Sequence, residues 1–434
     1  MKVNVPRVVT THEGGKAVEV NPLERLKRTV MACLLFEDNF YEDGMKCADR
    51  VTELCAKLSA LQITNLALEA SMKYKLRHMP LQLIVEALKH KQKGSWLSDA
   101  ICVIITRPDQ MTDLVALYWK QGRKPLAHQL KKGLAKAFRK FDEYQLSKYN
   151  RDNPIKLRDI LFMCHAKPFN DEQDAIWKRL IKDELATADT WETRLSSGAD
   201  KKESFQELLQ SRKMGKLAIL RNLRNMKEAG IDKKLVKDEL NANIKEMLPF
   251  QYLAAARECP EWEDIIDMAM VKSAAAKPKL PGHTILLVDV SGSMDALLAS
   301  KGTMTRMDAA CGLAILLREC CEDIHIYTFS NSLAALPPRQ GMALRDAIVQ
   351  SQPHAGTCMG GALKCLQPNI ISAMRVIVVT DEQTRDIIPP LLSKKNYILN
   401  IGPYENGVGS KNQWMTISGF SEASIDYIRM IEAE

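Results

Sequence analysis

The sequence has few of the features that place a protein in a membrane or in an oxidising compartment. No stretch approaches the ~20 consecutive apolar residues that a membrane-crossing helix needs. The first twenty residues contain no apolar run of signal-peptide length. The eleven cysteines are an odd number and include no CxxC pair, which argues against a disulfide framework and against a zinc ribbon. We therefore expect a cytoplasmic protein with reduced thiols and no membrane contact.

Signatures of common enzyme classes are also missing. The sequence contains no GxxxxGKS or GxxxxGKT phosphate-binding loop, no HExxH zinc motif and no cluster of carboxylates suited to catalysis. We expect a protein that is not an enzyme and has no catalytic residues. A nuclease or nucleotide hydrolase is the weaker alternative.

Positive charge is in excess, and it is unevenly distributed along the chain. The 434 residues carry a formal net charge of +8. Residues 281–434 contain 12 Lys and Arg against 15 Asp and Glu, whereas residues 1–280 contain 49 against 38, so the two parts carry −3 and +11. The basic first part is a candidate binder of a polyanion, although a solvated basic surface would have the same composition.

Residues 22–272 have the pattern of an all-helical domain. Apolar residues recur at three- and four-residue spacing in residues 47–58. Similar stretches lie at 82–89, 111–119, 126–141, 157–164, 203–226 and 234–247. Short breaks that contain Pro or Gly separate them. Short amphipathic helices with brief turns favour stacked helix pairs of the α-solenoid kind.

A change of pattern near residue 280 predicts a second domain at 283–434, with 273–282 as the linker. Four short, apolar, β-branched runs follow the linker, with helical stretches between the early ones. They are His283–Val290, Asp323–Phe329, Arg375–Thr380 and Asn396–Ile401. This alternation predicts an α/β domain with a doubly wound, largely parallel sheet.

Carboxylate and hydroxyl residues follow these strands. Asp289 ends the first strand, Ser291 and Ser293 follow in a short loop, Thr357 opens another loop, and Asp381 follows a later strand. Ligands of open α/β sheets gather at the carboxyl ends of the strands. Oxygen ligands of this kind suit Mg²⁺, Ca²⁺ or Mn²⁺. The alternative for the first loop alone is a strand-to-helix turn whose side chains satisfy backbone amides.

In this order and on an α/β background, the five residues resemble the metal-ion-dependent adhesion site of von Willebrand factor A domains. The resemblance covers about residues 281–434. It implies that Ser291, Ser293 and Thr357 bind a divalent metal, with Mg²⁺ as the first expectation. It further implies that Asp289 and Asp381 bind directly or through water, and that the electron-poor ion captures an acidic group of a partner. Hydrolysis would need a base placed to activate water, so we expect a binding site.

The first part is similar to the TROVE domain of the Ro autoantigen family, in its bacterial or phage form. The similarity lies in short pieces at 76–81, 131–134, 147–151, 157–161, 165–168, 190–192, 220–226 and 248–250. It implies a ring of HEAT-like helix pairs closed by an A-type domain, in a monomer. It also implies binding of small non-coding Y RNA on the outer surface and of single-stranded 3′ ends of misfolded RNA in the central hole.

Eleven residues are candidates for RNA contact, of which Lys148, Arg151 and His165 are implied by the resemblance to family motifs. They are Lys131, Lys132, Lys136, Arg139, Lys140, Lys148, Arg151, His165, Arg221, Arg224 and Asn225. The first five crowd one side of the helix predicted at 126–141, and a basic helix face can follow phosphates. The alternative for these five is a helix face that only water contacts. Arg221, Arg224 and Asn225 could instead bond neighbouring helices. His165 could instead be a buried structural histidine.

These patterns and the two resemblances imply two possible functions. The first is an RNA-binding scaffold for Y-like and misfolded RNA in RNA quality control, which an exonuclease or RNA-repair protein could join. The alternative is a metal-dependent protein-interaction module that captures an acidic ligand, with a helical ring that is mainly structural.

Overall fold

The computed structural model describes most of the chain. The described residues are 9–17, 21–32, 44–92, 94–120, 122–196, 198, 200–242, 247, 249–298, 302–404, 406–409, 413–419 and 423–433. They divide into two compact units. Arg50–Asp200 is the helical unit, and Met1–Asp49 together with Lys201–Glu434 is the sheet unit. None of the described helices combines the length and the apolar character that crossing a bilayer requires.

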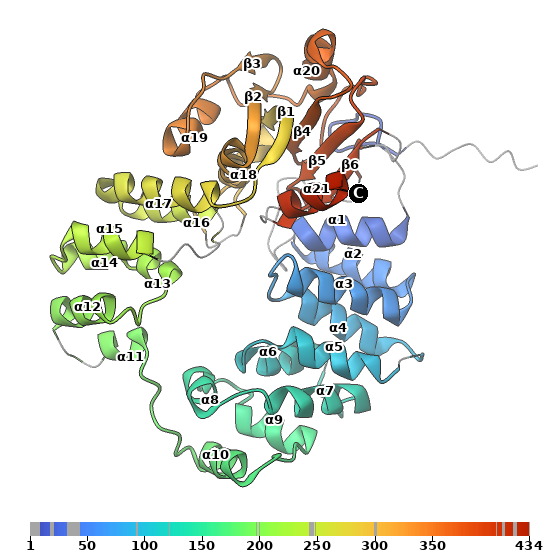
Figure 1. Ribbon diagram of the computed structural model, residues 1–434. Helices are drawn as coiled ribbons and strands as arrows, with labels where there is room; N and C mark the ends of the chain where they lie inside the picture. Colours follow the sequence, from blue (N-terminus) through green and yellow to red (C-terminus); the bar gives the residue numbers. More distant parts are fainter. Residues whose placement is uncertain are drawn as a thin grey trace, which may run out of the picture. The chain divides into compact units, whose positions relative to one another are not determined.

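The helical unit is a stack of short helices (Figure 1). Most of α2 (Gly44–Ala56) lies in it, followed by α3 (Ala60–Met72), α4 (Met79–Lys89), α5 (Trp96–Ile104), α6 (Asp109–Tyr118), α7 (His128–Phe138), α8 (Glu143–Tyr149), α9 (Leu157–Cys164), α10 (Asp171–Lys182) and α11 (Trp191–Ser196). In one layer α3 packs on α5, α5 on α7 and α7 on α9, while α4 packs on α3 and α6. The predicted succession of stacked helix pairs is confirmed.

Helix α7 shows how this stack is held together. Leu130, Leu134 and Ala137 are buried, as the sequence pattern predicts, although the helix is shorter than 126–141. Gly133 faces α5 so closely that a Cβ atom there would lie 2.6 Å from the Cβ of Ile101. The small residue therefore lets two helix backbones approach each other.

Outside its α/β part, the sheet unit contains the helices α1 (Pro22–Ala32), α12 (Lys201–Gln210), α13 (Lys216–Arg221), α14 (Leu223–Glu228), α15 (Lys233–Ala242), α16 (Pro249–Glu258) and α17 (Glu263–Ala275). The single helical stretch predicted at 203–226 is wrong, because it is three separate helices. Gly215 precedes α13 in an extended conformation, and the buried Asn222 separates α13 from α14.

The segment predicted as a linker, 273–282, is largely regular structure. Ser273 and Ala274 are buried in the last turn of α17, and β1 begins at Leu280. The Ala-rich sequence has high helix propensity, so the helix continues to within a few residues of the sheet. Helix α17 also packs on α18 (Arg306–Cys320) of the α/β part, so helical and α/β parts share one core here.

The sheet has six strands in the order β3-β2-β1-β4-β5-β6. They are β1 (Leu280–Asp289), β2 (Cys321–Phe329), β3 (Leu333–Ala335), β4 (Arg375–Thr380), β5 (Lys395–Asn400) and β6 (Met415–Ser418). All pairs are parallel except β2 with β3. The predicted doubly wound α/β fold is confirmed, with two short edge strands, β3 and β6, that the sequence pattern does not predict.

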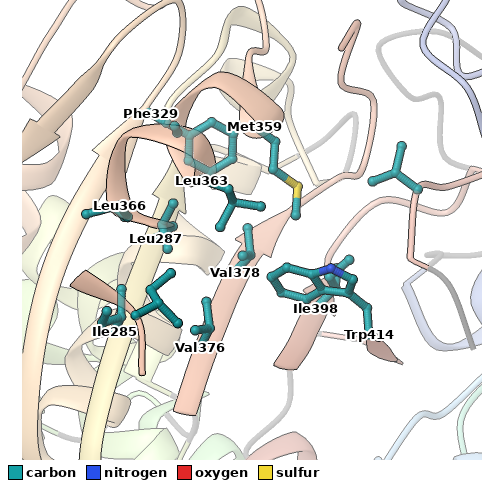
Figure 2. Close-up of a cluster of buried hydrophobic side chains, with 13 residues drawn as sticks. Ile285, Leu287, Phe329, Met359, Leu363, Leu366, Val376, Val378, Ile398 and Trp414 are labelled. Atoms are coloured by element: carbon teal, nitrogen blue, oxygen red, sulfur yellow. The ribbon is translucent and has the colours of Figure 1, made fainter. Parts of the chain in front are cut away.

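Both faces of the sheet are covered. Figure 2 shows Met359, Leu363 and Leu366 of α20 (Met359–Leu366) packed with side chains of β1, β4 and β5. Helix α18 is buried on almost every side, because α16 and α17 pack on it opposite the sheet. The remaining helices of this part are α19 (Gly341–Val349) and α21 (Ala423–Ala433).

Candidate functional sites

The sheet places the two predicted carboxylates beside each other. Strands β1 and β4 are parallel neighbours with Val288 opposite Val379, so their carboxyl ends coincide. Asp289 is the last residue of β1, and Asp381 comes directly after β4. Both are fully buried. The two carboxylates therefore meet at the carboxyl ends of the strands, the edge where open α/β sheets bind their ligands.

Asp289 is fixed by two hydrogen bonds from its own surroundings. The backbone N–H of Ser291 donates to Oδ1 at 2.9 Å, and the hydroxyl of Thr380 donates to Oδ2 at 2.6 Å. Burial, followed by the charge of Asp381, raises the pKa of Asp289 to about 7. Burial also raises the pKa of Asp381. Two carboxylates held in this way favour an additional positive charge between them.

The hydroxyl residues adjoin this pair. The Oγ atoms of Ser291 and Ser293 lie 3.3 Å apart, and the Ser293 side chain hydrogen-bonds Asp381. The N–H of Gly292 donates to the carbonyl of Ala355 at 2.9 Å, which brings the loop of Thr357 against this one. Four of the five predicted ligands thus share one polar cluster, and Thr357 is buried in the loop beside it.

Arg306, at the start of α18, is part of the cluster and was not predicted. Its Nη1 lies 3.3 Å from Oδ2 of Asp381 and donates to the hydroxyl of Tyr404 at 2.5 Å. Its guanidinium also lies 4.9 Å from the centre of the Tyr404 ring. One buried positive charge therefore offsets part of the charge of two buried carboxylates.

The donor set fits a hard divalent cation. Carboxylate and hydroxyl oxygens are the ligands that Mg²⁺, Ca²⁺ and Mn²⁺ prefer. Within the described residues, no group of three or more His, Cys, Asp or Glu side chains is placed to hold a metal, so a soft-metal site is not found there. With Arg306 included, the cluster has a net charge of about −1, and a bound dication would keep an excess positive charge for an acidic ligand.

Glu382, the residue after Asp381, is not free to act as a base. It has a positive φ of 60° and its carboxylate forms a buried ion pair with Arg28 of α1 at 2.8 Å. The same carboxylate accepts a hydrogen bond from the N–H of Val408 at 2.9 Å. Its contacts bind α1 to the loop of the cluster, which is a structural role.

A small N-terminal hairpin lies on the same loop. Its strands meet at the antiparallel bridge between Thr10 and Lys16. The hydroxyl of Thr11 donates to the carbonyl of Thr384 at 2.8 Å, and the ring of His12 lies edge-on to Tyr404 at 5.2 Å. No local sequence pattern indicates this contact, which joins residues more than 370 positions apart.

The five basic candidates around α7 have different surroundings. Lys136 pairs with Asp99, and Lys140 donates to the carbonyls of Cys102 and Ile105, so both are used against α5 and its C-terminal end. Burial lowers the pKa of Lys140. Arg139 donates to the carbonyl of Lys167 at 2.8 Å. Lys132 is exposed, and Lys131 is half-buried.

Two hollows of the helical unit contain four of the candidates. Lys131 and His165 line one of about 400 Å³, called the basic hollow, together with Trp119, Arg123 and Lys124. Lys148 and Arg151 line another of about 400 Å³ next to α8. His165 ends α9 with a φ of +51° and is exposed, so the alternative of a buried structural histidine is wrong.

Arg221, Arg224 and Asn225 lie in the sheet unit and do not share a helix. Arg221 ends α13, whereas Arg224 and Asn225 belong to α14. Arg224 lies 3.7 Å from both Glu228 and Glu258, and the amide of Asn225 donates to Asn222 at 3.0 Å. Arg224 and Asn225 thus contact neighbouring side chains, and all three remain exposed.

The chain was compared with known proteins. Residues 178–257 match the family model of the TROVE domain. A structural likeness extends over nearly the whole chain: the Ro (RSR) protein of Deinococcus radiodurans matches 94% of this chain and 98% of its own, with 16% identity and a TM-score of 0.64. One part of the chain therefore matches the TROVE family model, and the chain has the fold of the Ro protein. The comparison with curated protein sequences found no match.

The TROVE match of this protein begins in α10 and ends in α16. It includes Arg221, Arg224 and Asn225, whereas the basic hollow lies before it in the sequence. The most useful missed residues are Trp119, Arg123 and Lys124, which join Lys131 and His165 in that hollow. The combination of Trp with three basic residues in 119–124 is the signal that could have found them.

Proposed function

We propose that this protein is an RNA-binding scaffold without catalytic activity. Its RNA would be small and non-coding, of the Y-like kind, together with single-stranded ends of misfolded RNA, in RNA quality control. Ro and TROVE proteins are RNA-binding scaffolds and not enzymes. An exonuclease or RNA-repair protein would then join the complex as a partner.

The basic hollow is the observation that carries this proposal. Arg123, Lys124, Lys131 and His165 line it, and none of its described lining residues is acidic. A cluster of cations that are not neutralised by neighbouring carboxylates attracts phosphates. By contrast, Lys136 pairs with Asp99 at the edge of α5. The part of the chain before residue 281, which contains this hollow, carries a net charge of +11.

An electrophoretic shift series tests the proposal. Hairpin RNAs with and without a single-stranded 3′ tail are titrated with the full chain at several salt concentrations. We expect binding at low salt, and a logarithmic affinity that falls linearly with the logarithm of salt concentration. Absence of binding at low salt would contradict the proposal, as would binding that is independent of salt.

Matched charge reversals locate the contact. Lys131→Glu should weaken RNA binding about tenfold or more, because it replaces a phosphate-attracting charge in the hollow. Lys178→Glu reverses an exposed charge of α10 in the same unit, whose partner is Asp174, and should change the affinity by less than twofold. Equal effects of both variants would mean that the hollow has no special role.

We propose as a second function that the Asp289 cluster binds a divalent metal, Mg²⁺ in the first place, and through it an acidic protein ligand. The two buried carboxylates with raised pKa values favour this function. Ser291 and Ser293 would supply direct ligands, Thr357 a further one, and Asp289 and Asp381 direct or water-mediated contacts. When bound, the ion would supply the positive charge that the acidic ligand meets.

Metal binding is measured by isothermal titration of the chelator-treated protein with Mg²⁺ and Mn²⁺. Ser291→Ala should weaken binding by an order of magnitude or more, because it removes one ligand oxygen. Ser332→Ala, an exposed serine outside the cluster, is the control. If Ser291→Ala binds both metals as tightly as the unmodified chain, the assignment of the ligands is wrong.

A further inference from the structure

Two hollows of the helical unit adjoin each other at Trp119. The basic hollow has a volume of about 400 Å³ and the second, called the apolar hollow, about 370 Å³. Both are lined by Trp119, Arg123 and Met163, so these residues form the boundary between them. Together they are here called the Trp119 cleft. Each half has the size of pockets that hold small ligands.

The two halves differ in chemistry. The basic hollow adds Lys124, Lys131 and His165 to the shared residues. The apolar hollow adds Pro154, Ile155 and Phe162, and Asp159 is the one carboxylate among its lining residues. A ligand that fits both halves therefore has an anionic group at one end and a flat apolar group at the other.

Contacts with Arg123 and Lys124 hold the ring of Trp119 in place. Its indole N–H donates to the carbonyl of Lys124 at 2.7 Å, which fixes the plane of the ring. The guanidinium of Arg123 lies 4.8 Å from the ring centre. The guanidinium lies over one face of the ring, so a base would stack on the other face or on the guanidinium plane itself. Aromatic rings and Arg guanidinium planes are surfaces on which unpaired bases stack, while duplex RNA keeps its bases paired and out of reach.

Two residues of α9 add to this picture. Phe162 is 57% exposed although it is large and apolar, so its ring is available at the mouth of the apolar hollow. His165 holds a left-handed conformation that costs a non-glycine residue free energy, and it is one of the residues that line the basic hollow. Exposed aromatic and strained residues gather at the same cleft.

We infer that the Trp119 cleft binds one unpaired nucleotide of a single-stranded RNA, with its phosphate in the basic hollow and its base against Trp119 in the apolar hollow. Asp159 would accept a hydrogen bond from an amino or imino group of the base. This inference rests on the proposed RNA-binding function and adds to it a defined subsite. It predicts selection for single-stranded over double-stranded RNA at these residues.

The experiment uses the full chain and two fluorescein-labelled probes, a ten-nucleotide oligouridylate and a ten-base-pair RNA duplex. Fluorescence anisotropy gives the dissociation constants. Trp119→Ala should weaken binding of the single strand about tenfold, and Trp119→Phe should retain most of it, because a base can stack on either ring. Binding of the duplex should change by less than twofold in both variants.

Two further variants complete the experiment: one is a control outside the cleft, and the other is a second test of the cleft. Trp96→Ala changes a half-buried Trp of α5 that lines neither hollow and should leave both affinities unchanged. Arg123→Glu changes an exposed position, where misfolding is not expected. It should weaken single-strand binding and make the slope of log affinity against log salt concentration shallower by about one. Circular dichroism melting confirms that each variant is folded.

The outcomes separate this inference from the function on which it rests. If the unmodified chain binds the single strand and both Trp119→Ala and Arg123→Glu bind it equally well, the cleft is not the subsite, while RNA binding stands. If the unmodified chain binds neither probe, both proposals fail. Displacement of the single strand by a Glu-rich peptide at equal concentration would assign the cleft to an acidic protein and overturn the inference.

Discussion

The two ends of the parallel sheet bury charge under opposite conditions. At the amino ends of β4 and β5, Glu432 of α21 accepts a hydrogen bond from Arg375 at 2.6 Å and another from Lys395 at 2.9 Å. Burial disfavours the ionised form, but these donors outweigh it and hold the pKa of Glu432 below its ordinary value. At the carboxyl ends, the pKa values of Asp289 and Asp381 are both raised.

The difference separates a structural ion cluster from a candidate binding site. Glu432 has two cationic partners for one carboxylate, so that end is electrostatically complete. At the other end, Arg306 is the cation placed against the two carboxylates, and it lies on Asp381. Buried charges that remain undercompensated are costly, and they are expected where a ligand or ion completes them.

The largest expected effect is the loss of unfolding free energy when the ion cluster of Glu432, at the amino end of the sheet, loses its carboxylate. Glu432→Ala leaves Arg375, which is 1% exposed, without its carboxylate. Removal of one partner of a buried ion pair costs about 3 kcal/mol or more of unfolding free energy. Urea unfolding monitored by circular dichroism measures it. Glu172→Ala, at an exposed position of α10, serves as a comparison. A loss below about 1 kcal/mol for Glu432→Ala would show that Glu432 is not needed at this end of the sheet.

Only some features of the sheet and of its carboxyl end can be predicted from the sequence. The strands β1 and β4 contain continuous apolar runs and β2 and β5 shorter ones, so the sheet and the proximity of Asp289 to Asp381 could be predicted from pattern and topology. Arg306 lies 75 positions from Asp381, and no spacing rule links them. The edge strand β6 has four residues, too few for a clear period.

Basic residues illustrate the same limit in the helical unit. The sequence shows that Lys131, Lys136 and Lys140 lie on one short helical stretch. It does not show that Lys136 and Lys140 reach α5 while Lys131 lines a hollow, because that depends on how two helices pack. The close approach of α5 and α7 at Gly133 decides it.

Adding a divalent metal tests whether the carboxyl end of the sheet, at Asp289 and Asp381, binds a cation. If a dication completes the Asp289 cluster, Mg²⁺ at 100 times its dissociation constant stabilises the fold by about 2.7 kcal/mol. A thermal melt with Mg²⁺ and with a chelator measures the shift. Glu432→Gln should keep the shift, whereas Ser291→Ala, which binds the metal tenfold more weakly or worse, should reduce it to about 1.4 kcal/mol or less. An identical melting temperature with and without Mg²⁺ would contradict metal binding at this end.

Acid should lower the stability that Glu432 contributes at the amino end of the sheet. Because the folded-state pKa of Glu432 is depressed, its contribution to stability is present above the unfolded-state pKa and is lost as the pH falls through the folded-state pKa. Urea unfolding between pH 6 and pH 3 measures this loss. Glu432→Gln removes the contribution of this carboxylate, so the stability of the variant should fall less steeply as the pH is lowered. Equal pH dependence in both proteins would mean that Glu432 is not held ionised by its partners.

The smallest expected effect is a gain in stability from neutralising the incomplete end. Asp289→Asn keeps an oxygen for the N–H of Ser291 but removes a buried negative charge next to Asp381. In chelator at pH 8, we expect the unfolding free energy to rise by roughly 0.5 kcal/mol or to stay unchanged, because the ionised carboxylate is disfavoured there. Glu432→Gln under the same conditions should be destabilising. If Asp289→Asn costs as much as Glu432→Gln, the charges at the two ends are equally compensated, and the carboxyl end has no electrostatic reason to bind a cation.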